Sequence, residues 1–219
     1  MSSDARLTGV FGGTFDPIHF GHLRPALELQ ESLDLDEVLF IPSAVPPHRD
    51  TPNLDADTRL ELLRLAVAGQ AGFRVDDREL RRSGRSYMVD TLRSLRDERG
   101  EARPLCLLLG MDAFLGLPQW DRWQQLLDLA HVVVAHRPGW NVPSVGELGS
   151  LMRERGIRDR RALAERPAGW IYLQGVTSLD ISATRIRSLL AAGRSVRYLV
   201  PDTVWERIQR DGLYAAHAT

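Results

Sequence analysis

Short runs of apolar residues alternate along the chain with longer segments whose apolar residues recur at helical spacing. Each run has the length of a buried strand, and each longer segment has the period of an amphipathic helix. The predicted strands cover residues 8–11, 38–41, 73–75, 105–109, 132–135 and 170–173. The predicted helices cover residues 23–33, 58–68, 89–99, 120–129, 145–155 and 184–192.

This alternation predicts an α/β fold, in which helices cover both faces of a doubly wound parallel sheet. Ligands of such folds bind at the carboxyl ends of the strands. Residues 42–57 are rich in proline and form a long predicted loop, of a length that is often functional. Because the chain shows no repeat and no linker, residues 1–219 are predicted to form a single domain with a helical C-terminal part from about residue 181.

The first predicted strand leads into the stretch GGTFDP. The glycine pair Gly12–Gly13 is expected on the turn after the strand, where glycine permits unusual backbone angles and lets a ligand approach. Asp16 and Pro17 are expected to be the N-cap and the first residue of a helix. Such a helix start offers free N–H groups and a positive dipole end, which together form a phosphate site.

Two histidines, His19 and His22, follow at helical spacing and should share the face that looks toward this site. Gly21 between them costs about 1 kcal/mol relative to alanine in a helix, so close approach of another group is expected there. Alternatively, the two histidines could be half of a metal site, or they could be ordinary surface residues. We find no nearby carboxylate or cysteine set with metal-ligand spacing.

Composition removes several classes of function. All 28 basic residues are arginine, so the lysine of a P-loop, of a protein kinase or of a Schiff-base enzyme is missing. A net charge of −1 gives no general attraction for nucleic acid or for anionic membranes. The single cysteine, Cys106, is expected to be a buried apolar residue. Without an apolar leader or spanning segment, we expect a cytoplasmic protein.

The stretch from Gly13 to His22, GTFDPIHFGH, resembles the G-x-F-D-P-x-H-x-G-H motif of the nucleotidyltransferases related to class I aminoacyl-tRNA synthetases. Further stretches make nearly the whole chain similar to one family among them, the bacterial nicotinate-nucleotide adenylyltransferases. They are PSAVPPHR (42–49), RSGRSYMVDTL (82–92), GMDAFLGLPQWDRW (110–123), RPGW (137–140) and ISATRIR (181–187).

The resemblance implies a Rossmann-like nucleotidyltransferase fold and a reaction. The adenylyl group of ATP would pass to nicotinate mononucleotide, giving deamido-NAD and pyrophosphate. Mg²⁺ would be the cofactor, held mainly by the ATP phosphates and not by a protein metal site. Neither nucleic acid nor a membrane is implied as a partner, and a homo-oligomer is left open.

The resemblance also implies roles for individual residues. His19, His22 and Arg187 would be catalytic, with Arg187 folding back over the start of its helix toward the β and γ phosphates. The implied ATP-binding residues are Gly12, Gly13, Thr14, Phe15, Gly110, Asp112, Arg137, Ile181, Ser182 and Thr184. The implied acceptor-binding residues are His48, Arg49, Tyr87, Met88 and Trp120.

Some points stay open at this stage. Arg49 and Met88 stand where the family often has lysine and threonine, which leaves the pyridine pocket undefined in detail. Trp120 would stack on the pyridine ring, but it is also placed to pack as a core tryptophan on an amphipathic helix. Other acceptors, namely nicotinamide mononucleotide or pantetheine phosphate, remain alternatives, as do a non-catalytic nucleotide-binding module and a metal hydrolase.

Overall fold

The computed structural model describes residues 7–44, 51–136, 144–177 and 179–215. Its strands form a parallel sheet in the order β3-β2-β1-β4-β5-β7-β6. The strands are β1 (Leu7–Gly13), β2 (Leu35–Pro42), β3 (Phe73–Val75), β4 (Leu105–Gly110), β5 (His131–His136), β6 (Gly156–Ile157) and β7 (Ile171–Gly175). Since β2 and β4 flank β1, the chain reverses its direction of winding between β1 and β4.

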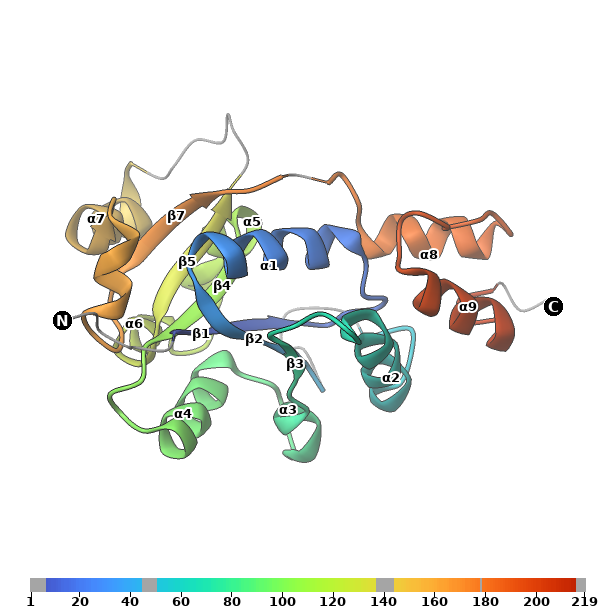
Figure 1. The fold of residues 1–219 in the computed structure, drawn as a ribbon, viewed down its shortest axis with the longest axis horizontal. Coiled ribbons are helices and arrows are strands. Elements are labelled where there is room, and N and C mark those ends of the chain that lie inside the picture. The colour runs from blue at the N-terminus through green and yellow to red at the C-terminus, as the bar shows by residue number, and fades with distance from the viewer. Residues whose placement is uncertain (1–6, 45–50, 137–143, 178, 216–219) are drawn as a thin grey trace.

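Helices surround this sheet, and Figure 1 shows α1 and α4 on opposite sides of it. They are α1 (Phe20–Ser32), α2 (Ala56–Val67), α3 (Arg78–Arg81), α4 (Met88–Arg99), α5 (Met111–Leu115), α6 (Leu126–Leu129), α7 (Gly146–Arg155), α8 (Ala183–Ala191) and α9 (Asp202–Asp211). The described residues also form the short 3-10 turns η1 (Leu117–Gln119), η2 (Trp123–Gln125) and η3 (Arg160–Ala164). No helix in the described part of the chain is long and apolar enough to cross a bilayer.

Burial explains why the apolar runs became strands. Neighbouring residues of β2 and β4 point to opposite faces and are buried on both, so their side chains enter two separate cores. One core packs against Leu23 and Leu29 of α1, and the other against Leu92 and Leu95 of α4. The predicted doubly wound parallel sheet is therefore confirmed.

All six predicted strands are present, and the sequence pattern missed only the short β6 among the described strands. The helix predicted over residues 120–129 is wrong. This segment begins with an extended Trp120, turns at Arg122 through the left-handed region (φ 51°), and becomes helical only as η2 and α6. The apolar spacing there reflects packing of successive turns, which the periodicity of the sequence does not distinguish from a helix.

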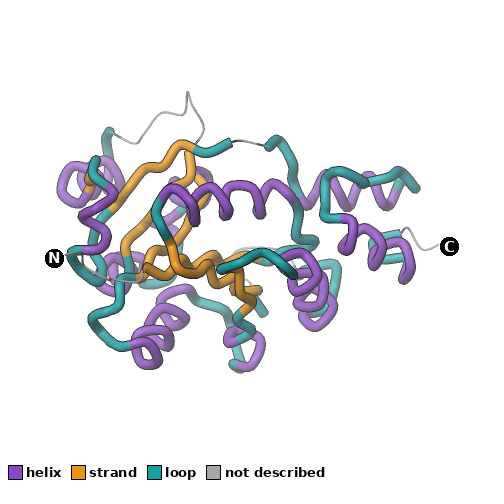
Figure 2. The backbone as a smooth tube through the Cα atoms, viewed as in Figure 1, coloured by secondary structure: helices purple, strands orange, loops and turns teal. Residues whose placement is uncertain are grey.

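The C-terminal helices α8 and α9 lie beyond one end of the sheet, and Figure 2 shows them to one side of the central strands. Their buried residues Ile186, Val204 and Ile208 belong to the same core cluster as the strand residues Val38 and Phe40. On the surface, Arg207 of α9 forms an ion pair with Glu61 of α2. The helices α8 and α9 thus have a defined place next to the sheet.

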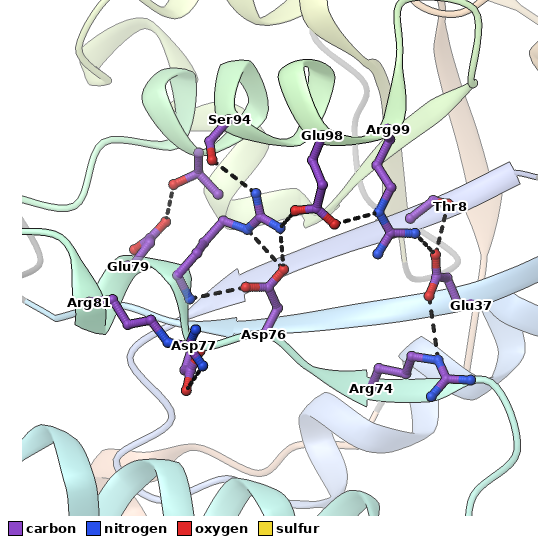
Figure 3. Close-up of polar contacts among 12 residues, drawn as sticks. Thr8, Glu37, Arg74, Asp76, Asp77, Glu79, Arg81, Ser94, Glu98 and Arg99 are labelled. Atoms are coloured by element: carbon purple, nitrogen blue, oxygen red, sulfur yellow. Dashed lines mark hydrogen bonds and ion pairs between the residues drawn. The ribbon is translucent and has the colours of Figure 1, made fainter.

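A polar network fixes α4 to the sheet edge formed by β2 and β3 (Figure 3). The guanidinium of Arg78 donates to Asp76 at 2.6 and 2.8 Å and to Glu98 of α4 at 2.7 Å. Farther along α4, Arg99 pairs with the mostly buried Glu37 of β2. These contacts hold in place the helix that carries the second half of the RSGRSYMVDTL stretch.

Candidate active site

A cavity of about 1160 Å³ opens at the carboxyl ends of β1 and β4, where the direction of winding reverses. This is the place where open parallel sheets bind ligands. It is lined by most of the residues that the sequence assigned to catalysis and ATP, namely Gly12, Gly13, Thr14, Phe15, His19, His22, Gly110, Asp112, Ile181, Ser182, Thr184 and Arg187.

The two glycines at the end of β1 act differently from the sequence prediction. Gly12 and Gly13 are the last residues of the strand and not a turn, and neither has a positive φ. Because glycine has no side chain, each position leaves room for a neighbouring side chain. A Cβ on Gly12 would lie 2.4 Å from the Met88 Cε, and a Cβ on Gly13 would lie 2.9 Å from the Phe15 ring. The bare backbone lets these two side chains close over the strand end.

The predicted N-cap at Asp16 is wrong. The Asp16–Pro17 peptide is cis, and α1 begins only at Phe20, with His19 as its N-cap. The Asp16 carboxylate is engaged elsewhere, because it accepts hydrogen bonds from the Asn53 N–H and the Tyr214 hydroxyl, both at 2.7 Å. The first N–H of α1 is also not open to a ligand, since Phe20 donates it to the Leu199 carbonyl at 3.0 Å.

The two histidines share one face at the start of α1, as predicted. Their rings are stacked with centroids 3.7 Å apart and an angle of 28° between planes. His19 is buried, and its Nδ1 has no hydrogen-bond partner among the described residues. Burial lowers the pKa of His19 to about 4, so this imidazole is neutral at physiological pH. It can therefore offer a directed hydrogen bond but no full charge.

Gly21 marks the point where the two helix starts touch. A Cβ there would lie 2.9 Å from the Cε1 and Nδ1 of His19 and 3.0 Å from the Ile181 carbonyl oxygen. Close approach was expected from the sequence. The approaching group is the chain itself, at the residue that precedes the N-cap of α8.

The start of α8 agrees closely with its prediction. Ser182 is the N-cap, and its hydroxyl accepts the Arg185 N–H at 3.2 Å. Arg187 folds back toward this end, where it reaches the Thr184 Oγ1 at 3.4 Å and donates to the Asp16 carbonyl at 2.7 Å. Two helix starts that are far apart in sequence thus present imidazole and guanidinium groups to one cavity.

The residues assigned to the acceptor are only partly placed. His48, Arg49 and Arg137, the last of them assigned to ATP, lie outside the described residues. Within the described ranges, Tyr87, Met88 and Trp120 are not among the side chains that line the cavity. They are half-buried residues packed against the core on the α4 side, which agrees with the packing alternative for Trp120. Their contact with an acceptor stays a prediction.

An arginine joins the two stretches that carry these residues. Arg122 donates two hydrogen bonds to Asp90 of α4, at 2.9 and 2.8 Å, and its guanidinium lies 5.7 Å from the centre of the Tyr87 ring. The segment around Trp120 is therefore tied to the start of α4. This pair connects GMDAFLGLPQWDRW with RSGRSYMVDTL in space.

Comparison with known proteins decides the family. The sequence profile of the cytidylyltransferase-like family matches residues 10–189. A curated relative from Methylococcus capsulatus, named as a probable nicotinate-nucleotide adenylyltransferase, is 50% identical over 95% of this chain and 100% of its own length. A relative of the same name from Pseudomonas syringae pv. tomato is 50% identical over 100% of this chain and 98% of its own length. The chain belongs to the nicotinate-nucleotide adenylyltransferase family.

The fold of this nicotinate-nucleotide adenylyltransferase family is also found among solved structures. The nicotinic acid mononucleotide adenylyltransferase of Plasmodium falciparum, solved in complex with NaAD, superposes with a TM-score of 0.68. It is 15% identical in sequence, and the match covers 95% of this chain and 97% of that one. The predicted Rossmann-like nucleotidyltransferase fold is confirmed.

The sequence analysis missed two residues that line the cavity of this family member and one that contacts its wall. His136 at the end of β5 lines the cavity, and its place directly after an apolar strand is the same signal that pointed to Gly110. Asn53 also lines the cavity, but no pattern in the loop sequence distinguishes it. Tyr214 reaches Asp16 across 198 positions of sequence, a contact that only the folded chain reveals.

Neither a reactive cysteine nor a protein metal site is supported by the described residues. Cys106 is fully buried, and burial raises the pKa of its thiol to about 12, which confirms the apolar role predicted for it. Among the described residues, no three His, Cys, Asp or Glu side chains gather into a metal site. The chemical groups that line the cavity include the His19 and His22 imidazoles, the Arg187 guanidinium, and the carboxylates of Asp16 and Asp112.

Proposed function

We propose that this chain transfers the adenylyl group of ATP to nicotinate mononucleotide, forming deamido-NAD and pyrophosphate. An oxygen of the mononucleotide phosphate attacks the α-phosphorus of ATP. The bond from the α-phosphorus to the oxygen that bridges it to the β-phosphorus breaks, and its electron pair leaves with pyrophosphate. Such a transfer needs alignment of the reactants and neutralisation of charge more than covalent help from the protein.

One observation carries this proposal: the starts of α1 and α8 open into the same cavity at the carboxyl ends of β1 and β4. A triphosphate is long enough to need donors from more than one element, and the side chains of His19, His22 and Arg187 at the two helix starts would supply them. The names of the relatives support the choice of reaction, as does the NaAD bound in the Plasmodium falciparum enzyme.

The catalytic residues we propose are His19, His22 and Arg187. The two imidazoles would donate hydrogen bonds to the phosphates, and His22 would contribute most as charge builds up in the transition state. Arg187 would hold the β and γ phosphates with its planar guanidinium. The groups proposed for the rest of ATP are Gly12, Gly13, Thr14, Phe15, Gly110, Asp112, Arg137, Ile181, Ser182 and Thr184.

The acceptor is proposed to contact His48, Arg49, Tyr87, Met88 and Trp120. Because Tyr87 and Trp120 are half-buried outside the cavity lining, this role requires the acceptor to extend beyond the cavity toward α4. Met88 lies against Gly12, where the β1 end meets that side. A cytoplasmic location, the lack of a nucleic-acid partner and a homo-oligomeric state stay predictions.

Mg²⁺ is proposed to arrive with ATP, bound mainly by phosphate oxygens. The donor set fits this arrangement, because the Asp16 carboxylate at the cavity is already engaged by Asn53 and Tyr214. The bound ion would neutralise charge on the leaving pyrophosphate. The chain's own part is to orient the phosphates with His22 and Arg187.

The experiment that tests the proposal is pyrophosphate release from ATP with each acceptor in turn. We expect the highest kcat/KM with nicotinate mononucleotide, a lower value with nicotinamide mononucleotide, and none with pantetheine phosphate. Preference for pantetheine phosphate, or ATP binding without pyrophosphate release from any acceptor, would overturn the proposal. Loss of activity with a zinc chelator but not on withdrawal of magnesium would instead favour a metal hydrolase.

A further inference from the structure

Asp16 is a buried carboxylate at the wall of the ATP cavity, and both of its oxygens are in use. Its Oδ1 accepts the Tyr214 hydroxyl at 2.7 Å, and its Oδ2 accepts the Asn53 N–H at 2.7 Å. The nearest guanidinium nitrogen of Arg187 is 4.0 Å from Oδ2 and donates instead to the Asp16 carbonyl at 2.7 Å. Arg187 therefore lies beside this carboxylate without a short ion pair to it.

A second arginine near Asp16 is committed to other partners. Arg59 is buried, and its guanidinium donates to the carbonyl oxygens of Thr14 at 2.6 Å, Leu54 at 3.3 Å and Ala44 at 3.4 Å. Arg59 thus fixes the backbone on either side of the cavity wall. Of these two described arginines, Arg187 is the one whose guanidinium, 4.0 Å from the carboxylate, would shift from the Asp16 carbonyl to the Asp16 carboxylate if the latter lost a donor.

The backbone after α9 fixes the position of Tyr214, near the end of the described chain. Helix α9 ends at Asp211 and is followed by the left-handed C-cap Gly212 (φ 62°), and the Leu213 N–H donates back to the Ile208 carbonyl at 3.0 Å. Tyr214 itself has φ 63°, a conformation that costs energy for a residue other than glycine and persists where its surroundings enforce it. Burial beside Asp16 raises the pKa of the Tyr214 phenol, which keeps the hydroxyl protonated as a donor.

We propose that Tyr214 is a positioning residue of the ATP site, whose hydroxyl satisfies Asp16 and thereby leaves Arg187 available to the ATP phosphates. The inference rests on the proposed function, because it assumes that Arg187 binds phosphate. Without the Tyr214 hydroxyl, the buried carboxylate lacks one of its donors, and a short pair with Arg187 is the compensation closest at hand. An arginine held in that pair is lost to ATP.

The test compares Tyr214→Phe with Tyr198→Phe, a matched control that removes the hydroxyl of an exposed C-terminal tyrosine. ATP affinity by titration calorimetry and steady-state pyrophosphate release are measured for both variants. We expect Tyr214→Phe to weaken ATP binding and lower kcat/KM for ATP by about tenfold, as for loss of a hydrogen bond to a charged group. The KM for nicotinate mononucleotide should change less than twofold, and Tyr198→Phe should match the unmodified protein.

A double-mutant cycle separates positioning from a merely structural role. In an Arg187→Ala background, Tyr214→Phe should weaken ATP binding by less than twofold, because the residue through which it acts is gone. An equal loss in both backgrounds would overturn the proposal, as would unchanged ATP binding in Tyr214→Phe alone. Thermal unfolding confirms that each variant is folded at the assay temperature.

Failure of the proposed function gives a different result. If the unmodified protein releases no pyrophosphate with nicotinate mononucleotide, the reaction is wrong. The calorimetric cycle on ATP binding still decides whether Tyr214 positions Arg187.

Discussion

Replacing Gly21 by alanine adds one methyl group at the contact between the starts of α1 and α8. The new Cβ would lie 2.9 Å from two atoms of the His19 ring and 3.0 Å from the Ile181 carbonyl oxygen. Ordinary contact begins at 3.4 Å, so the neighbours must retreat by about 0.5 Å. The ring or the backbone before α8 has to move, and both belong to the proposed ATP site.

Two opposing effects set the stability of Gly21→Ala. Alanine is better than glycine inside a helix by up to about 1 kcal/mol. Overpacking in a close-packed region costs about 1–3 kcal/mol. The free energy of unfolding should therefore fall by about 0–2 kcal/mol, which leaves the protein folded. Activity should suffer more, because a shift of this size at a catalytic group is expected to lower kcat/KM by about tenfold.

The assay is pyrophosphate release with ATP and nicotinate mononucleotide, together with urea unfolding of the same preparations. Gly116→Ala is the matched control, because its added Cβ would lie 3.5 Å from the Asp112 carbonyl oxygen, an ordinary contact, and its φ is negative. The control should keep kcat/KM within twofold. If Gly21→Ala also stays within twofold, the close contact of the two helix starts has no part in the reaction.

Three further predictions test separate parts of the molecule. His22→Ala should lower kcat at least about a hundredfold while unfolding stays cooperative, and near-normal turnover would remove His22 from the mechanism. Glu79→Ala should lower the free energy of unfolding in urea by about 1–3 kcal/mol, because Glu79 is buried and accepts the Thr91 hydroxyl at 2.6 Å; a change below about 0.5 kcal/mol would contradict this. Burial lowers the pKa of His131 from 6.5 to about 4. Between these pH values the unfolded chain binds a proton on His131 and the folded chain does not, so acid favours the unfolded chain. The part of the stability that depends on His131 should be complete above pH 6.5 and fall by up to about 3 kcal/mol toward pH 4. His131→Gln should remove this part, so that the urea-derived profile becomes less steep between pH 6.5 and 5 and keeps the slope due to His19.

The structure gives that last prediction a simple basis. The His131 Nδ1 accepts the Trp170 N–H at 3.1 Å, and its Nε2 lies 2.9 Å from the Arg166 carbonyl oxygen. A neutral ring with its proton on Nε2 satisfies both neighbours. Protonation of Nδ1 would break the bond to Trp170. An unchanged pH profile in His131→Gln would show that this ring does not control acid stability.

Local patterns predicted the sheet well because its strands are buried on both faces. Runs such as residues 105–109 are apolar throughout, and nothing but a central strand or a buried helix needs such a run. The segment around Trp120 was misjudged for a related reason. Its apolar spacing is typical of a helix, but Arg122 adopts a left-handed conformation that interrupts the helix. Arg122 also donates two hydrogen bonds to Asp90, which lies outside the segment and could not be taken into account from local spacing.

The site was predictable where local chemistry determines it. Ser182 caps α8 with its own side chain, and the short spacing of His19 and His22 brings their rings together at the start of α1, with His19 as the N-cap. Asp16 was misassigned as a cap because its partners, Asn53 and Tyr214, come from distant parts of the chain. Long-range contacts of this kind leave no periodic mark in a sequence.

The most direct measurement is a crystal structure of this protein with a non-hydrolysable ATP analogue. We expect one triphosphate in the cavity, with the His19 and His22 rings and the Arg187 guanidinium all within hydrogen-bond distance of its oxygens. A structure in which Arg187 and the histidine pair contact different ligands, or in which the phosphates bind away from the starts of α1 and α8, would contradict the proposed arrangement.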